Sequence, residues 1–78
     1  MSLSETVEKE LADILAAYDL ACELYGTTWV RQRVLIDITG FSSGIVYERM
    51  NMLVICMEFE RYSVSGAHVR YKWIGGGA

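Results

Sequence analysis

Apolar positions in the first 25 residues recur with the period of an α-helix. One stripe consists of residues spaced three or four apart: Val7, Leu11, Ile14, Leu15, Tyr18, Cys22 and Tyr25. Leu20 and Leu24 add a second, narrower apolar side. Ser2 and Ser4 are both suitable N-cap residues, and Gly26 is a suitable C-terminal stop. The pattern predicts one amphipathic helix over 4–25.

A second helical pattern begins directly after that glycine. Thr27 or Thr28 can cap a helix over 29–39. Leu35 and Ile38 are expected to face the core from this helix. Gly40 then ends it.

A third helix is predicted over 43–55, with Ser42 or Ser43 as its cap. Its apolar residues define an inner face: Ile45, Val46, Met50, Leu53 and Val54. Its outer face is left with Ser43, Tyr47, Glu48 and Asn51. The run 50–57 is expected to lie in the core, apart from an outward-facing Met52.

The last part of the chain changes to a period of two residues. Apolar and charged side chains alternate over 57–62, as in a half-buried strand, and Ser65-Gly66 is a turn signal. Over 67–74 one side consists of Val69, Tyr71 and Trp73, and the other of His68, Arg70 and Lys72. The pattern predicts a β-hairpin over 57–74 with a cationic face, followed by a frayed glycine-rich tail at 75–78.

Length and composition indicate a single globular domain with an ordered core over 3–74. The chain has 78 residues, of which 53% are hydrophobic. No apolar run approaches the roughly 18 residues of a membrane span, and the first residues do not resemble a secretory signal. Cys22 and Cys56 both lie in apolar stretches, which favours buried, reduced thiols over a disulfide. We therefore expect a cytoplasmic protein.

Charge is distributed unevenly along the chain. The net charge is −3, which by itself disfavours nucleic acid as a partner. However, the first 26 residues carry six acidic side chains and one lysine, whereas the remaining 52 carry six basic and four acidic ones. A local field acts within about 10 Å at ordinary ionic strength, so a positive face can exist beside a negative one.

The stretch from Ile38 to Leu53 resembles the helix-turn-helix of small winged-helix transcription regulators. An apolar residue, the turn glycine Gly40, another apolar residue and a capping serine lead into the third helix, as in that superfamily. The segment 68–71 resembles the superfamily's wing. The resemblance covers about residues 27–74 and implies an α+β fold of three helices followed by a two-stranded wing.

The same resemblance implies a double-stranded DNA-binding protein, with the third helix in the major groove and the wing on the backbone. The residues expected to contact DNA are Ser42, Ser43, Gly44, Tyr47, Glu48, Arg49, Asn51, Arg61, His68, Arg70 and Lys72. No cofactor, metal or membrane is expected. The chain departs from the superfamily in two respects. Ile55-Cys56-Met57 occupies the place where a glycine often stands, and the third helix offers only Arg49, next to Glu48.

Simpler interpretations of the same residues remain open. The serines are helix caps first, His68 is more typical of a surface residue than of a ligand, and the cationic strand face can be an ordinary solvated face. The domain can instead be an assembly module that uses its acidic first helix. Enzymatic motifs are missing from the sequence. A homodimer through the first helix is expected, because Leu20, Leu24 and Leu3 lie away from its core stripe.

Overall fold

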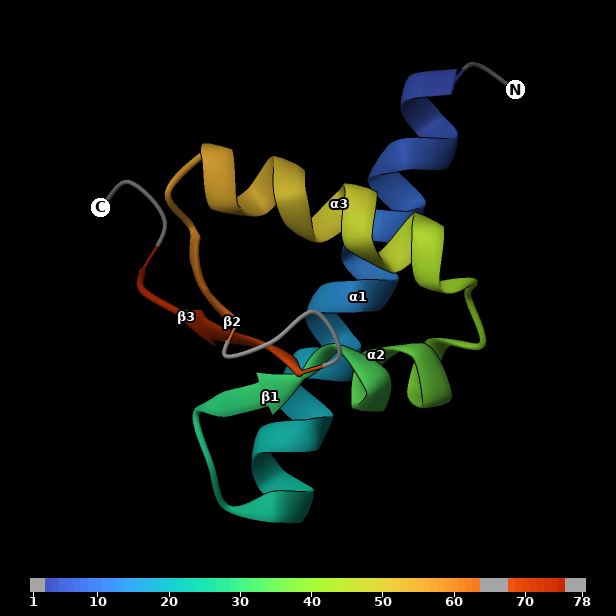
Figure 1. Cartoon of the computed structure of the whole chain (residues 1–78). Coiled ribbons are helices and arrows are strands. Elements are labelled where there is room, and N and C mark those ends of the chain that lie inside the picture. The colour runs from blue at the N-terminus through green and yellow to red at the C-terminus, as the bar shows by residue number, and fades with distance from the viewer. Residues whose placement is uncertain (1–2, 64–67, 76–78) are drawn as a thin grey trace.

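The computed structural model describes residues 3–63 and 68–75 and shows an α+β fold. In chain order the elements are α1 (Leu3–Tyr25), β1 (Trp29–Arg31), α2 (Gln32–Thr39), α3 (Ser43–Ile55), β2 (Phe59–Ser63) and β3 (Val69–Trp73). In Figure 1, α1 runs along the molecule behind the other elements. Helix α3 crosses the N-terminal half of α1, whereas β1 and α2 lie over its C-terminal half. The three predicted helices are therefore present.

Three helix ends follow the capping residues that the sequence offers. Gly26 and Gly40 adopt left-handed φ values of 62° and 75°, and their amides donate to Cys22 and Ile36 carbonyls, both at 2.9 Å. Ser42 is the N-cap of α3, where its hydroxyl accepts from the Ile45 amide at 3.3 Å. These short-range signals act within one turn of the helix, which is why the sequence reveals them.

Residues 29–31 depart from the prediction, because they form strand β1 and not the first turn of a helix. The side chain of Thr27 accepts from the Trp29 amide at 3.1 Å before the strand. Helix α2 begins only at Gln32, after Arg31, whose side chain makes no capping bond. The cause is long-range: β1 pairs antiparallel with β3, about 40 residues away.

The sheet consequently has three strands, in the order β1-β3-β2, and is not a two-stranded hairpin. In β3, Arg70 lies between Arg31 of β1 and Tyr62 of β2, while Lys72 lies between Trp29 and Glu60. The expected turn at Ser65-Gly66 and the tail at 76–78 lie outside the described residues, as does the candidate cap Ser2.

The core lies between the three helices and one face of this sheet. It consists of Ile14, Ala17, Tyr18, Ala21, Val30, Leu35, Val46, Met50, Leu53, Phe59 and Tyr71. Two alanines of α1 are fully packed there, although their small size made them weak signals in the sequence. Three expected core residues are more exposed than predicted: Leu15 at 37%, Tyr25 at 65% and Ile38 at 36%.

Tyr18 connects α1 to the sheet. Its hydroxyl donates to the Thr28 carbonyl at 2.6 Å and accepts from the Trp73 amide at 3.0 Å. Its ring meets Phe59 edge-to-face, with centroids 4.9 Å apart. The pairing of β1 with β3 ends at Lys72, so the amide of the next residue, Trp73, has no partner in β1. The Tyr18 hydroxyl accepts the hydrogen bond from this amide.

The passage from α3 to β2 corrects a second expectation, that the run 50–57 lies in the core. Met50 and Leu53 are buried, but Ile55 and Met57 are 71% and 68% exposed, and Cys56 is exposed as well. Met57 adopts φ 61°, a left-handed conformation that glycine adopts more readily than other residues. The helix ends at Ile55, so the residues that follow turn away from the core. Cys22, the other free thiol, is half-buried.

Among residues 3–63 and 68–75, no helix combines the length and apolar character that crossing a bilayer requires.

Candidate functional site

The residues expected to contact DNA separate into three groups. Ser43, Gly44, Tyr47 and Glu48 are all exposed along α3, on the side away from the buried Val46 and Met50. Ser42 precedes them as the helix cap. This part of the predicted site is brought together by helical periodicity alone.

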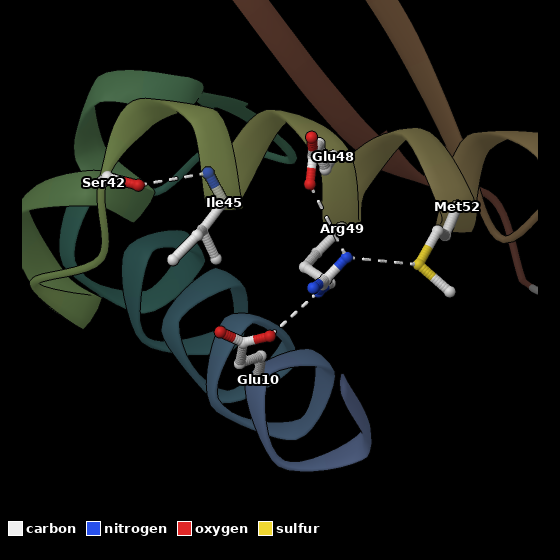
Figure 2. A network of polar contacts seen from close by, with 6 residues as sticks. All are labelled: Glu10, Ser42, Ile45, Glu48, Arg49 and Met52. Atoms are coloured by element: carbon white, nitrogen blue, oxygen red, sulfur yellow. Dashed lines mark hydrogen bonds and ion pairs between the residues drawn. The ribbon is translucent and has the colours of Figure 1, made fainter. Parts of the chain in front are cut away.

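Arg49 lies on the same helix but turns toward α1, as Figure 2 shows. Its Nε donates to Glu10 Oε1 at 3.0 Å, and both side chains are mostly shielded, at 19% and 16% exposure. A terminal nitrogen of the same guanidinium group lies 4.0 Å from a carboxylate oxygen of Glu48 and 3.8 Å from the sulfur of Met52. The charge of Arg49 is thus compensated within the protein, and α3 exposes no free cation.

Arg61 occupies the space between β2 and α3. It lies on the inner face of the sheet, because its register partner in β3 is the buried Tyr71. One terminal nitrogen donates to Asn51 Oδ1 at 3.1 Å and lies 3.5 Å from the Tyr47 hydroxyl. The guanidinium carbon lies 4.4 Å from the Tyr47 ring centroid and 5.4 Å from that of Tyr71. Arg61 therefore lies directly behind the exposed side of α3.

Arg61 has no acidic partner among the residues that the structure describes. Its Nε and second terminal nitrogen are buried and make no hydrogen bond. Aromatic faces and an amide oxygen hold the guanidinium in place but do not neutralise it. A full positive charge therefore lies under Tyr47 and Asn51, in contrast to the compensated charge of Arg49.

Tyr71 completes this inner cluster. Its hydroxyl donates to Gln32 Oε1 at 2.7 Å, which joins β3 to the start of α2. Burial raises the pKa of Tyr71 above its ordinary value, and the neighbouring Arg61 partly offsets that rise. We call Ser43, Gly44, Tyr47, Glu48 and Asn51, together with Arg61 behind them, the helix surface.

Arg70 and Lys72 lie on the opposite, outer face of the sheet. Both alternate with the inner residue Tyr71, so neither faces the helices. His68 precedes this strand and is exposed. Arg61 belongs to the same strand pair, as expected, but a period of two residues places it on the inner face with Phe59.

Three outer-face residues were missed by the sequence reasoning: Trp29, Arg31 and Tyr62. Trp29 and Arg31 belong to β1, which was predicted as helix. Tyr62 was placed in a strand without a functional role, although it follows Glu60 on the same face and is 56% exposed. Their shared face becomes visible only once β1 is known to flank β3.

The outer aromatic side chains meet above the central strand. The rings of Trp29 and Tyr62 have centroids 6.1 Å apart at an interplanar angle of 63°. Lys72 Nζ lies 5.8 Å from the Trp29 ring centroid. Trp29, Tyr62 and Arg70 line a hollow of about 280 Å³. We call Trp29, Arg31, Tyr62, Arg70 and Lys72 the sheet surface.

Neither surface has the makings of a metal centre. Over the described ranges, the structure contains no cluster of three or more histidine, cysteine or acidic side chains able to hold an ion. The helix surface instead has one cation behind a ring, an amide and a hydroxyl group, and the sheet surface has three cations beside two aromatic rings. Such groups suit a polyanion with planar bases.

Comparison of the chain with protein-family models, with curated proteins and with solved structures gives no match.

Proposed function

We propose that the chain is a winged-helix domain that binds double-stranded DNA through the helix surface. The element order supports this, since α2 and α3 are joined by a short glycine turn and a pair of antiparallel strands follows α3. These are the parts of the winged helix-turn-helix superfamily that the sequence resembles.

The observation that carries the proposal is the uncompensated charge of Arg61. It lies 4.4 Å from the ring of Tyr47, which is itself 46% exposed on α3. Its field extends over about 10 Å at ordinary ionic strength, which includes the exposed side of the helix. A phosphate backbone that approaches α3 therefore meets a positive charge despite Glu48 and the protein's net charge of −3.

Each residue of the helix surface then has a role. Ser43 and Gly44, in the first turn of α3, permit close approach of a phosphate to the free amides of the helix start. Tyr47 and Glu48 reach toward base edges. Asn51 gives its oxygen to Arg61, which leaves its amide nitrogen to donate to a base or a phosphate.

Titration of a labelled duplex at several salt concentrations tests the proposal. The parent is expected to bind more weakly as salt increases. Arg61→Met is expected to weaken binding about tenfold, equivalent to about 1.4 kcal/mol, for every duplex sequence. Tyr47→Ala is expected to change the preference among sequences. Lys9→Gln, which removes one exposed cation from α1, is the control and should bind like the parent.

The alternative is an assembly module that uses the acidic first helix. It replaces the DNA proposal if the parent binds no duplex at low salt, or if Arg61→Met binds like the parent. The exposed acids on α1 are its basis: Glu5, Glu8, Asp13, Asp19 and Glu23.

We further propose a homodimer formed through α1. Leu20 and Leu24 are 43% and 64% exposed, so the sheet does not cover them. Leu20 shares a shallow hollow with Ile38 of α2, which extends the apolar area. Light scattering over a concentration series is expected to show Leu24→Glu shifting the mass toward the monomer, whereas the matched change Ile55→Glu should not. A parent that remains monomeric at high micromolar concentration contradicts the dimer.

A further inference from the structure

We propose that the sheet surface binds unpaired nucleotides of a single-stranded nucleic acid. In this arrangement the bases stack on Trp29 and Tyr62, and Arg31, Arg70 and Lys72 hold the phosphates. The site goes beyond the duplex site, because it lies on the other face of the sheet and shares no residue with the helix surface.

The aromatic pair is the first argument. Trp29 lies on one edge strand and Tyr62 on the other, yet their rings come within 6.1 Å of each other over β3. Tyr62 remains 56% exposed, so no element among the described residues covers its ring. Trp29 is half-buried beside it. Accessible aromatic rings on an open sheet are the surfaces on which unpaired bases stack, and every base has a face that suits them.

The cations are the second argument. Arg31 and Arg70 are direct partners across the antiparallel pair, and like charges in such positions repel each other. Within the described chain, Arg31, Arg70 and Lys72 form no ion pair, and Glu60 is the one acid in strand positions on this face. A phosphate between the two arginines would relieve their repulsion, and a bidentate contact suits their guanidinium groups.

The hollow has room for one unit of a longer strand. Its volume of about 280 Å³ lies at the small end of the range of roughly 300–1,000 Å³ that encloses whole small-molecule ligands. Trp29, Tyr62 and Arg70 line it, so it combines two ring faces with one cation. One base with its phosphate fits this combination, and the neighbouring nucleotides can continue along the open sheet. A duplex keeps its bases stacked inside and offers none to the rings.

Fluorescence of Trp29 provides a direct readout. In a Trp73→Phe background, Trp29 is the sole tryptophan, because the chain has only two. A twelve-nucleotide oligo(dT) is expected to quench its emission at low salt, and an oligo(U) of equal length distinguishes DNA from RNA as the preferred strand. A duplex of equal length should quench it at least about tenfold less effectively. Binding of neither single strand at low salt overturns the proposal.

Substitutions then assign the effect to the sheet surface. Tyr62→Ala is expected to weaken single-strand binding about tenfold, and Tyr62→Phe should restore it, since stacking needs the ring and not the hydroxyl. Arg70→Gln should lower the dependence of log K on log salt by about 0.7, the value for one phosphate contact on a single strand. Tyr47→Ala, on the helix surface, is the control and should leave quenching unchanged.

Failure of this site and failure of the duplex site give different results. If oligo(dT) quenches the emission of Tyr62→Ala as strongly as that of the parent, while circular dichroism shows a folded protein, the sheet surface is only a solvated face. If Tyr62→Ala does not fold, unchanged binding by Arg70→Gln leads to the same conclusion. A duplex that quenches Trp29 as strongly as the single strand also overturns the proposal. Loss of duplex binding in Arg61→Met, in contrast, concerns the helix surface alone.

Discussion

The inner and outer faces of the sheet both combine arginine with aromatic side chains, but the surroundings of the arginine differ between the two faces. On the inner face, Arg61 is held between Tyr47 and Tyr71 and by Asn51, so its position is set by packing. On the outer face, Arg70 lies beside Tyr62 and opposite Arg31, with no acid or amide bound to it in the described structure. In the proposed duplex site the inner arginine would act through its field, whereas the outer one is available for direct contact.

This difference teaches that the charge of a surface cannot be counted from the sequence. The charge of Arg49 is compensated because its side chain pairs with Glu10. The charge of Arg61 is not, because this side chain contacts only aromatic rings and an amide. A protein with a net charge of −3 can in this way keep positive fields in two defined places.

The largest expected contrast is between an inner and an outer aromatic residue. Phe59 is 1% exposed, so Phe59→Ala should reduce the free energy of unfolding by about 3–5 kcal/mol. Tyr62→Ala on the outer face of the same strand should cost at most about 1 kcal/mol, the size of a cross-strand pair. Urea titrations followed by circular dichroism measure both. Equal losses would contradict the assignment of the two faces.

Removal of a single hydroxyl tests the connection between α1 and the sheet. Tyr18→Phe leaves the Thr28 carbonyl and the Trp73 amide without their partner. The expected loss is about 1–3 kcal/mol, the cost of unsatisfied buried polar groups. Tyr25→Phe, at a 65% exposed position of the same helix, is the matched control and should change the midpoint little. An unchanged midpoint in Tyr18→Phe would show that water replaces both bonds.

A pair of arginine substitutions separates compensated from uncompensated charge. Arg49→Leu leaves Glu10 shielded and unpaired, so the free energy of unfolding should fall by about 1 kcal/mol with little change in duplex affinity. Arg61→Met removes two buried N–H groups that have no acceptor, so stability should not fall while duplex affinity does. The reverse pattern, with a less stable Arg61→Met and a DNA-defective Arg49→Leu, would exchange the two roles.

Alkaline pH is expected to act through the inner face, with the smallest effect for any single group. Burial raises the pKa of Tyr71 and of Tyr18 above the ordinary value of 10.0. The folded state thus favours the neutral phenols, and stability should be level below about pH 10 and decline as the pH rises further. Tyr71→Phe should make this decline shallower, whereas Tyr62→Phe should not. Denaturant midpoints between about pH 9 and pH 12 measure it.

The helix ends show how far sequence reasoning reaches. Gly26, Gly40 and Ser42 act through hydrogen bonds that span four residues or fewer, and all three function as the sequence indicates. The expected core was less accurate where an element ends, because Ile55 and Met57 continue an apolar run past the last turn of α3. An apolar run does not reveal where the helix stops, and exposure changes at that point.

The candidate site divides in the same way. Periodicity places Ser43, Tyr47 and Glu48 on one side of a helix, and alternation separates Arg70 from Tyr71. The partners of Arg49 and Arg61 could be identified only from the structure. Glu10 lies 39 residues before Arg49 in the chain. Tyr47 and Asn51 lie on α3, whereas Arg61 lies on β2. Side-chain pairs of this kind depend on how the elements pack, and no local pattern encodes them.

The sequence by itself therefore determined that three helices are present, that two of them end at Gly26 and Gly40 and one begins after Ser42, and that β2 and β3 alternate. These features depend on short-range hydrogen bonds and on the burial of one side of each element. Tertiary structure alone decided that Trp29–Arg31 is a strand, since β3 supplies its hydrogen-bond partners and overrides the local preference. That pairing also brings Trp29 and Arg31 beside Arg70 and Tyr62, and so creates the sheet surface that the linear pattern does not contain.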